Sequence, residues 1–457
     1  MDCGLVLIAV LRNFLSWVRG TWVGTYLPID KNINFHKWLA WAVAFFTTLH
    51  SVAHFVNVYN MAYVTPAATL IQLGLLKQGG IPKNPWEWAF TTIPGATGVF
   101  TCVVMFIMWT TAVESVRRPM FEAFWYTHHL WVVFYLLQCV HGIAGLLEQP
   151  MFWMYTIGPM LFYIIERIIR IVRGSQKTII IEAIQHPSRV LEIRMKKATF
   201  NYSPGQYIFL QCSYIADFEW HPFTISSSPD DDYMSVHIRI VGDWTGKMYN
   251  LLNPEKKSGL VQENLLSAPN GKPILEVDGP YGTASEDVWQ FETVMLIAAG
   301  IGSTPFASIL KSIKYKIENE GCQLKLVQFY WTNRDLQSFE WFVDLLAQLE
   351  KTCPFLEIYL YFTGDLSADQ VRAYMMNTVT PDDDGEVDLV TGLHSRTTYG
   401  RPNINSIFEE QSQRFAGKTV GVFFCGPHTM GREIRKCCEK STDVVHDTRF
   451  IYHKENF

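Results

Sequence analysis

Long runs of apolar residues alternate with short polar segments through the first third of the chain. Most of these runs reach the roughly 18 to 20 residues that a bilayer-spanning helix requires. The sequence therefore predicts five membrane spans, over residues 3–18, 38–56, 91–113, 124–147 and 152–171. The first run begins almost at Met1 and contains Arg12, and no small-residue cleavage site follows it. We interpret it as a span cut close to its start and not as a signal peptide.

Lysine and arginine residues between these runs predict their orientation, because cytoplasmic loops of membrane proteins collect positive charge. Such residues follow the first, third and fifth runs: Arg19, Lys31 and Lys37; Arg117 and Arg118; Arg167, Arg170, Arg173 and Lys177. We therefore expect residues 57–87 and 142–151 on the outer side and everything after residue 174 in the cytoplasm. An odd number of spans leaves Met1 outside.

Beyond Lys177 the pattern changes to short strands in which apolar and polar residues alternate, separated by Pro, Gly and Asp turns. This pattern is typical of a small antiparallel β-barrel. After about Trp289 each apolar strand precedes a loop and a helix, which predicts an α/β domain with a parallel sheet. The predicted architecture is thus a membrane α-helical bundle over residues 1–173, an antiparallel β-barrel over 174–288 and an α/β domain over 289–457.

Composition narrows the function classes. Charged residues make up 18% of the 457 residues, below the roughly 25% usual for soluble domains. A net charge of −5 and the lack of a Lys/Arg-rich tract argue against nucleic acid as a partner. The nine cysteines show no CxxC and no regular spacing, so neither a cysteine zinc site nor a disulfide scaffold is expected.

Four histidines around the second and fourth apolar runs form two candidate pairs. His36 and His50 are 14 residues apart, about 21 Å of helical rise, so their rings lie on about the same helix face. Both runs are predicted to run outward, so His36 can face His128 and His50 can face His141. Two such pairs are typical of the axial ligands of two bis-histidine haems. The alternative is a set of polar residues that line a helix bundle.

The second pair of histidines does not fit a regular helix. His128 and His141 are 13 residues apart, which leaves their rings about 140° out of phase. We expect either a locally overwound helix or two haems at different azimuths. Arg12 and His54 are the other polar groups in the membrane part, and a cation there could neutralise haem propionates or stabilise a reduced anionic acceptor. Helix packing with snorkelling is the alternative for both.

The second half contains a series of motifs in a fixed order. They read "PGQYIFL", "HPFTISSS", "HIRIVGDWT", "DGPYGT", "AAGIGSTPF", "CGP" and a final "ENF". Together they resemble ferredoxin-reductase-like FAD and nicotinamide modules. With the paired membrane histidines in front, the chain resembles the NADPH oxidase family over essentially its whole length. That resemblance implies FAD, two b-type haems and NADPH as cofactors.

The resemblance also implies which residues bind the flavin. The "HPFT" segment would lie along the flavin through His221, Pro222, Phe223 and Thr224, and the "HIR" segment would reach its phosphates through His237, Ile238 and Arg239. Trp244 and Thr245 would also bind the cofactor. On physical grounds, Arg239 can pair with a pyrophosphate and Thr224 can hydrogen-bond the isoalloxazine edge.

Gly300, Gly302 and Pro305 lie where an apolar strand meets a helix. The backbone there can approach a pyrophosphate, and the helix N-terminus can bind it. Arg334 and Arg401 are candidates for the adenosine 2'-phosphate, because guanidinium groups match phosphate geometry. A surface salt bridge is the alternative for each arginine.

The resemblance assigns the remaining site residues to the end of the chain. Cys425, followed by Gly426 and Pro427, would lie beside the nicotinamide C4, where a small side chain helps to aim the hydride. Phe457 would be the terminal aromatic residue that stacks on the flavin and yields to the nicotinamide.

The function implied by the resemblance is electron transfer from cytosolic NADPH through FAD and two haems to molecular oxygen outside, which yields superoxide. We expect a multi-pass protein of the plasma membrane, with membrane or cytosolic regulatory subunits as partners. The family core has six spans, and the first, before Cys3, is missing from this sequence. Two alternatives remain open: a ferric-chelate reductase with the same electron path, and a truncated, non-catalytic regulatory form.

Overall fold

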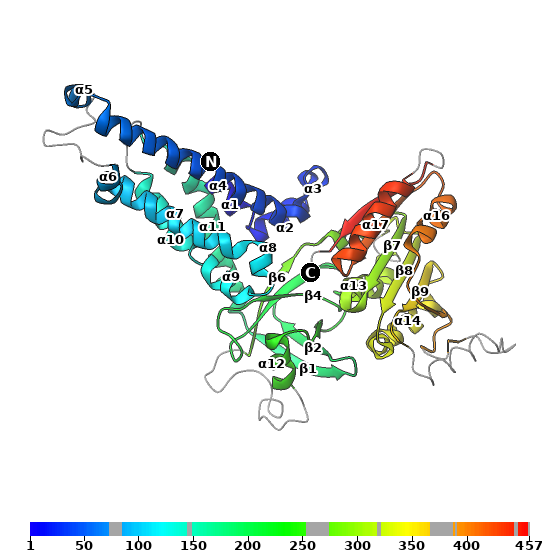
Figure 1. Cartoon of the computed structure of the whole chain (residues 1–457). Helices are drawn as coiled ribbons and strands as arrows, with labels where there is room; N and C mark the ends of the chain where they lie inside the picture. The colour runs from blue at the N-terminus through cyan, green and yellow to red at the C-terminus, as the bar shows by residue number, and fades with distance from the viewer. Residues whose placement is uncertain are drawn as a thin grey trace. The chain divides into compact units, whose positions relative to one another are not determined.

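The computed structural model describes residues 1–72, 85–143, 149–252, 274–317, 321–365, 387–388, 391–442 and 447–455. The chain divides into two compact units, Met1–Ile168 and Ile169–Phe457. The first unit is built from helices, and the second contains all the β-strands together with further helices (Figure 1).

The first unit contains one long helix and several shorter ones. Its helices are α1 (Asp2–Ile8), α2 (Arg12–Arg19), α3 (Trp22–Tyr26), η1 (Ile29–Lys31), α4 (Asn32–Tyr63), α5 (Ala67–Gln72), α6 (Pro85–Thr91), α7 (Ile93–Ala112), α8 (Glu114–Arg117), α9 (Phe121–His128), α10 (Trp131–His141) and α11 (Phe152–Gly174), whose last turn belongs to the second unit. A small core lies between α1 and α10, where Leu7 contacts Phe134 and Tyr135. The Tyr135 hydroxyl donates a hydrogen bond to the carbonyl of Cys3.

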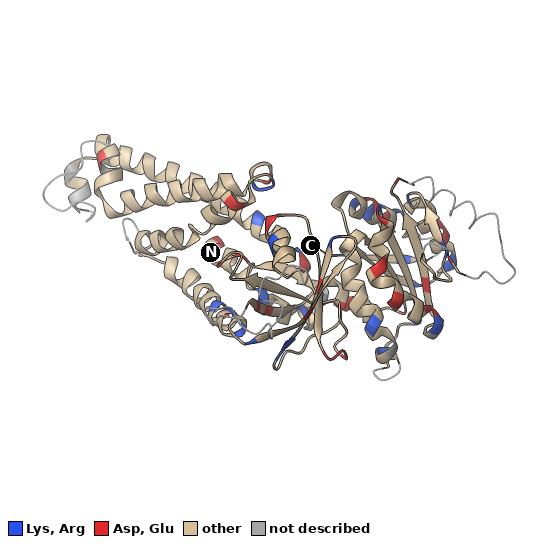
Figure 2. Cartoon of the chain, turned by 90° about the horizontal axis from the view of Figure 1, so that it is seen from below, with Lys and Arg blue, Asp and Glu red and all other residues tan. Residues whose placement is uncertain are grey.

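Most of the apolar surface of α4 is exposed. Trp38 is 75% exposed and Phe45 is 64% exposed. Large exposed apolar surfaces of this kind mark contact with another apolar phase. Figure 2 shows few charged residues along the long helices of this unit. Such a surface is suited to lipid and not to water.

Among the described helices, two are long and apolar enough to cross a membrane, Ile29–Tyr63 and Ile93–Ala112. The sequence predicted five spans. Two of the other three are each divided: residues 3–18 form α1 and α2, and the part of 124–147 that is described forms α9 and α10. The third, α11, is continuous over 23 residues but carries charged residues in its second half. The outer loops predicted at 57–87 and 142–151 lie partly outside the described residues.

The second unit begins with two antiparallel sheets of three strands each. One has the order β1-β2-β5 and the other β4-β3-β6. The elements are β1 (Thr178–His186), β2 (Val190–Lys197), β3 (Tyr207–Cys212), β4 (His221–Thr224), β5 (Met234–Arg239), α12 (Asp243–Leu251) and β6 (Leu275–Tyr281). Side chains from both sheets pack into one core that includes Leu191, Leu210 and Val236.

The predicted closed barrel is not formed by the described strands. The two sheets meet at a single bridge between Ile225 and Val236. A closed barrel needs a continuous ladder between neighbouring strands. Next to this bridge, the backbone N–H of Ser235 donates its hydrogen bond to the side-chain hydroxyl of Ser227 at 2.8 Å and not to a backbone carbonyl of the other sheet.

The rest of the second unit has the predicted α/β fold with a parallel sheet, so this prediction is confirmed. Six parallel strands lie in the order β10-β9-β8-β7-β11-β12. The elements are η2 (Ala284–Gln290), β7 (Thr293–Ala299), η3 (Gly300–Ser303), α13 (Thr304–Tyr315), β8 (Leu326–Asn333), η5 (Leu336–Phe339), α14 (Glu340–Thr352), β9 (Leu356–Phe362), β10 (Thr397–Tyr399), α16 (Ile404–Arg414), β11 (Thr419–Cys425), α17 (His428–Ser441) and β12 (Arg449–Lys454).

Helices cover both faces of this sheet, and each face has its own core. Successive residues of a strand point to opposite faces. Leu296 accordingly lies in the core beneath α13 and α14, whereas Met295 and Ile297 lie in the core beneath α16 and α17. Burial on both faces explains why these strands read as continuous apolar runs.

A buried carboxylate fixes the end of α11 to the second antiparallel sheet. Asp278, which is 1% exposed, accepts hydrogen bonds from Arg170 at 2.9 Å, from Arg173 at 2.8 Å and from the Tyr281 hydroxyl at 2.6 Å. Burial alone would raise the pKa of Asp278, but these three donors outweigh it and lower the pKa. Asp278 is therefore an anion that holds two arginines.

We predict that Asp278→Asn lowers the stability of the second unit by about 3–5 kcal/mol, because it removes the buried carboxylate charge to which both Arg170 and Arg173 donate hydrogen bonds. The measurement is the temperature at which detergent-solubilised protein unfolds, followed by release of bound flavin. The control is Glu292→Gln, which breaks an exposed pair with Lys325 and should cost less than about 1 kcal/mol. Equal effects of the two variants would contradict this interpretation.

Candidate functional site

The structure brings the four membrane histidines together as two pairs. The rings of His36 and His128 have centroids 6.3 Å apart, and those of His50 and His141 are 6.0 Å apart. Both pairs join α4 to the α9–α10 segment. An iron atom between two imidazoles, with metal–nitrogen bonds of about 2 Å, requires ring centroids about 6 Å apart. Each pair therefore fits one haem iron.

Hydrogen bonds orient two of these rings through the nitrogen that would not bind iron. His36 Nδ1 lies 3.3 Å from the carbonyl oxygen of Val6, and His141 Nδ1 lies 3.1 Å from the hydroxyl of Thr97. Partners of this kind fix the tautomer and leave Nε2 for a metal. Gly98 gives His141 its room, since a Cβ at Gly98 would lie 3.1 Å from the ring.

A tight turn between α9 and α10 offsets part of the phase mismatch between His128 and His141. Here the backbone N–H groups bond three residues back: His129 to Tyr126, Leu130 to Thr127 and Val132 to His129. Such bonds belong to a 3₁₀ helix with about 3.0 residues per turn, which adds about 20° per residue to the rotation of an α-helix. The overwinding therefore accounts for roughly 60° of the 140°, and the rest lies in the change of direction between two separate helices.

Arg12 and His54 lie at different places in this unit. Arg12 is the first residue of α2, whose start is capped by the buried Glu166: its carboxylate accepts from the backbone N–H groups of Asn13 and Phe14. The His54 ring lies 4.4 Å from that of His50, one turn along α4. His54 therefore belongs to the neighbourhood of the second pair, and Arg12 to a polar contact between α2 and α11.

Strand β4 divides the predicted "HPFT" flavin residues between its two faces. His221 and Phe223 face the indole of Trp244, with ring centroids 4.2 Å and 5.9 Å away. Pro222 is exposed on the other face, where Thr224 is buried. The indole N–H of Trp244 is buried and has no hydrogen-bond partner in the part of the chain that the structure describes. An acceptor atom of a bound cofactor fits this orphaned donor.

The "HIRIVGDWT" residues do not act as one group. His237 lies in a buried cluster with Glu192 and Ser226, and Ile238 is 1% exposed. Strand β5 is covered by neighbouring elements up to its last residue, and contact of His237 and Ile238 with a flavin phosphate stays a prediction.

Arg239, by contrast, is exposed at the end of β5. Its Nη1 would lie 3.4 Å from a Cβ at Gly300. No ion pair involves Arg239 within the described residues. The guanidinium therefore lies beside the glycine loop, where it can pair with a pyrophosphate. Thr245 has a structural contact instead: its hydroxyl accepts from the N–H groups of Val241 and Gly242 at the start of α12.

The glycine loop follows β7 and leads into α13. Gly300 has a φ of +58°, which favours glycine, and its carbonyl accepts a 2.9 Å hydrogen bond from the indole of Trp331. A Cβ at Gly302 would lie 2.3 Å from the carbonyl oxygen of Cys425. Pro305 occupies the first turn of α13, where no N–H is required. The loop is thus packed closely against β11 at the start of a helix.

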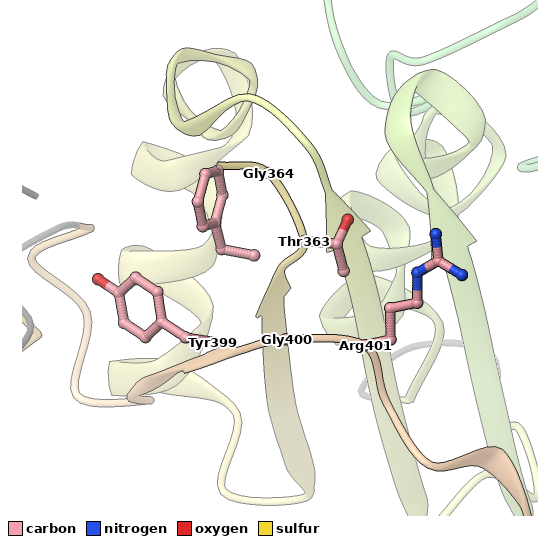
Figure 3. Close-up of a pocket in the computed structure, with 6 residues that line it drawn as sticks. Thr363, Gly364, Tyr399, Gly400 and Arg401 are labelled. Carbon is pink, nitrogen blue, oxygen red and sulfur yellow. The ribbon is translucent and has the colours of Figure 1, made fainter. Parts of the chain in front are cut away.

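Arg334 and Arg401 are both exposed at the carboxyl ends of the parallel strands. Arg401 lines a hollow of about 120 Å³ with Phe362, Thr363, Tyr399 and neighbouring glycines. Figure 3 shows the side chains of Thr363 and Arg401 on one side of the hollow and the side chain of Tyr399 on the other.

The backbone of Arg334 lies against the same hollow, since a Cβ at Gly364 would collide with the Arg334 carbonyl group. Neither Arg334 nor Arg401 forms an ion pair within the described ranges. The alternative that each arginine forms a surface salt bridge is therefore not supported by any acidic partner among the described residues. Ligands of open α/β sheets bind outside the carboxyl ends of the strands, and both guanidinium groups are available there to a phosphate.

The "CGP" residues join β11 to α17. Cys425 is buried beside Gly302, and burial raises the pKa of its thiol, so it is uncharged at neutral pH. A neutral, small side chain can position a ligand ring but is a weak nucleophile. Gly426 is packed against Ala299, and Pro427 caps α17.

The predicted terminal aromatic residue, Phe457, lies outside the described residues. Two residues earlier, the buried carboxylate of Glu455 accepts hydrogen bonds from the backbone N–H and hydroxyl of Ser285. The backbone N–H of Glu455 also donates to the carbonyl of Phe424. Glu455, two residues before Phe457, is therefore bonded to both η2 and β11.

Comparison with known proteins gives this arrangement a family. Family models match in chain order: "Ferric reductase like transmembrane component" over residues 3–139, "FAD-binding domain" over 176–285 and "Ferric reductase NAD binding domain" over 291–439. The chain is 50% identical over 463 residues to a superoxide-generating NADPH oxidase heavy chain of Dictyostelium discoideum, an alignment covering all of this chain and 87% of the relative. The chain belongs to the NADPH oxidase family.

Two further relatives agree with this membership. A second superoxide-generating NADPH oxidase heavy chain of Dictyostelium discoideum is 41% identical over 479 residues, covering 100% of this chain and 67% of the relative. NADPH oxidase 3 of Homo sapiens is 36% identical over 519 residues, covering 100% and 89%. As an NADPH oxidase family member the chain is a membrane oxidoreductase, and the prediction of FAD, haem and NADPH as its cofactors is confirmed.

Several residues that shape the site of this NADPH oxidase were not predicted from its sequence. Trp331 holds the glycine loop, Asp278 holds two arginines, Glu166 caps α2 and Glu455 anchors the final residues. Only Glu166 had a visible signal, since a carboxylate within a predicted span is costly and normally functional. The others lie in motifs whose letters do not reveal their long-range partners.

We predict that His128→Ala lowers the haem content of the purified NADPH oxidase from two per chain to one, because His36 loses the facing ligand. His129→Ala is the matched control: its Nδ1 bonds the carbonyl of Trp125 and its ring packs on Trp125. It should retain both haems. The measurement is the pyridine haemochrome spectrum per mole of protein. Loss of haem in the His129 variant alone would contradict the pairing.

We predict that Gly302→Ala lowers the rate of NADPH-driven flavin reduction by about 100-fold, because the new methyl group forces the loop away from Cys425 and displaces the nicotinamide. Anaerobic stopped-flow measurement of flavin bleaching reports this step directly. Gly246→Ala is the control, since its nearest neighbour would be a methyl group of Ile240 at 4.0 Å. An unchanged rate in the Gly302 variant would show that close approach of the loop is unnecessary.

Proposed function

We propose that this chain transfers electrons from NADPH on the cytoplasmic side, through FAD and two b-type haems, to molecular oxygen on the far side, where superoxide forms. The observation that carries the proposal is the pair of histidine–histidine contacts along one continuous helix, His36 with His128 and His50 with His141. Two metal sites about 21 Å apart along α4 suit transfer across a hydrocarbon core of about 30 Å. The relatives' designation as superoxide-generating supports the same acceptor.

We propose the domain division 1–173 for the di-haem domain, 174–288 for the FAD domain and 289–457 for the NADPH domain. In this scheme the four histidines are axial ligands. The FAD domain uses the surface of β4, Trp244 and Arg239, and the NADPH domain uses the glycine loop, Arg334 and Arg401. When bound, FAD would accept a hydride from NADPH and release electrons singly to the haems.

The chain's own residues would then determine position and charge. Arg239 beside Gly300 would hold a pyrophosphate, and the start of α13 would add backbone N–H groups to it. Cys425, a buried neutral thiol, would set the height of the nicotinamide ring above the loop. Phe457 would cover the flavin until the nicotinamide replaces it. His54, whose ring lies 4.4 Å from that of His50, would place a polar group at the oxygen-reducing end.

Localisation and partners follow from the same scheme. The chain would be a multi-pass protein of the plasma membrane, with the segment after residue 174 in the cytoplasm. Arginines at the end of α11 and after α7 support this orientation, because positive charges gather on the cytoplasmic side. Regulatory proteins of the membrane or the cytosol would be its protein partners.

The proposal is tested with purified, FAD- and haem-loaded protein in liposomes supplied with NADPH. We expect reduction of an external acceptor that superoxide dismutase suppresses, and loss of that reduction in His50→Ala and His141→Ala. Ferric-chelate reduction without superoxide would overturn oxygen as the acceptor. Loss of haem with no turnover in the unaltered protein would instead support a non-catalytic regulatory form.

We predict that Arg401→Gln raises the KM for NADPH about tenfold or more and leaves the KM for NADH unchanged, because a charged hydrogen bond to the 2'-phosphate contributes about 1.5–3 kcal/mol. Steady-state kinetics with the two nucleotides measure this difference. Arg435→Gln serves as control: its guanidinium is 59% exposed and pairs with Glu439 on α17. A parallel rise for NADH would mean that Arg401 supports the fold and does not select the nucleotide.

A further inference from the structure

Three metal-ligating side chains meet on one face of the β1-β2-β5 sheet. His186, Glu192 and His237 bring their ligand atoms within 4.8 Å of one another. Their side chains are 10%, 6% and 6% exposed, respectively. His186 and Glu192 are not among the residues assigned above to the nicotinamide, flavin or haem sites, and the buried imidazole of His237 faces Glu192.

The sheet register produces the cluster. Glu192 on the central strand β2 lies directly opposite His237 on β5. On its other side it pairs with Ile184, two residues before His186, the last residue of β1. Directly opposite and diagonal residues on one face of an antiparallel sheet are the nearest cross-strand neighbours. The cluster is therefore fixed by backbone pairing and not by flexible loops.

Both histidines are oriented through Nδ1, which leaves Nε2 facing Glu192. His186 Nδ1 lies 3.0 Å from the carboxylate of Glu340, and His237 Nδ1 lies 2.7 Å from the hydroxyl of Ser226. Histidines that bind a metal characteristically use their second nitrogen in this way. A carboxylate behind a histidine also makes the ring a stronger ligand.

The facing atoms already lie at ion-pair distance or slightly beyond, and one metal ion could bridge them after small shifts. Glu192 Oε2 lies 3.4 Å from His186 Nε2 and 3.8 Å from His237 Nε2. His186 Nε2 is buried and has no hydrogen-bond partner in the described chain. Ligand atoms around a tetrahedral ion with bonds of about 2.0–2.1 Å lie about 3.3 Å apart. Small side-chain shifts would therefore close the three atoms around one ion.

Charge near the cluster is compatible with a dication. Glu192 Oε1 is held by the guanidinium of Arg194 at 2.7 Å, which orients the carboxylate and leaves Oε2 for the ion. The two carboxylates that face the cluster, Glu192 and Glu340, are balanced by the two nearby cations, Arg194 and Lys311, so the surroundings carry no net positive charge. Two imidazoles and one carboxylate favour Zn²⁺ and related transition metals over Mg²⁺ or Ca²⁺, which prefer oxygen ligands.

We propose that His186, Glu192 and His237 form a binding site for a transition-metal ion of the Zn²⁺ class, with water as the fourth ligand and Glu340 and Ser226 as the groups that orient the histidines. No cysteine takes part. Glu340 and Trp341 begin α14, and the Trp341 ring lies 4.3 Å from that of His237. A bound ion would therefore stabilise the contact between the flavin-domain sheet and the nucleotide-binding domain.

The test uses the full-length, FAD- and haem-loaded protein without an affinity tag, so that the membrane histidines are occupied. Zinc is added to chelator-treated protein, and bound metal is measured by mass spectrometry after gel filtration. X-ray absorption at the zinc edge reports the ligands. We expect one zinc ion per chain with two imidazole ligands, and a higher unfolding temperature in its presence.

The variants are chosen so that a folding defect is recognised. His186→Gln, His237→Gln and the double variant should lose zinc and the temperature rise. Glu340→Gln keeps all three ligands and should weaken zinc binding about 10- to 100-fold. His453→Gln is the control, because His453 also faces a carboxylate, Asp287 at 3.5 Å, in a place where the described residues hold no cluster of three metal-ligating groups; the zinc content of this variant should be unchanged. Bound flavin and its reduction by NADPH verify the fold of each variant.

The proposal is overturned if the unaltered protein binds no more zinc than the double variant, or if bound zinc survives both single histidine substitutions. The cluster would then be a hydrogen-bonded histidine–carboxylate group only. Neither result bears on superoxide formation, which the liposome assay measures separately.

Discussion

The arrangement of the membrane unit depends on α4, a single unbroken helix of 32 residues. Because it is continuous, it fixes the separation of His36 and His50 at 14 residues of regular rise, about 21 Å. Any facing element has to match that separation. The α9–α10 segment does so through its overwound turn and the change of direction between its two helices, which bring His128 and His141 against α4 although their spacing is wrong for a regular helix.

In the second unit, the corresponding constraint is that all six strands of one sheet are parallel. Their carboxyl ends therefore lie along a single edge, where the glycine loop, Arg334, the hollow beside Arg401 and Cys425 all occur. Small residues permit close approach at this edge, as at Gly302 and Gly364. In the proposed NADPH site, residues more than a hundred positions apart would therefore lie around one nucleotide.

The sequence predicted those features that depend on local periodicity and on motif order. Apolar strands buried on both faces identified the parallel sheet, and the 14-residue spacing identified the histidine pairs. Features that depend on distant partners could not be predicted. Nothing near His237 in the sequence reveals Trp341 lying over it, so its burial was missed. The antiparallel strands of the predicted barrel are present as two sheets joined at one bridge, but closure is not shown by the described strands, because alternation defines strands and not closure.

The spacing of the two histidine pairs also has an electrical consequence. An electron that moves from the level of His36 to that of His50 travels about 21 Å of a hydrocarbon core about 30 Å thick, roughly two-thirds of the membrane potential. A full crossing involves about 2.3 kcal/mol per charge at 100 mV, so this step involves about 1.5 kcal/mol. Turnover thus charges the membrane as a current charges a capacitor. Sustained activity requires an equal flow of compensating ions through another route.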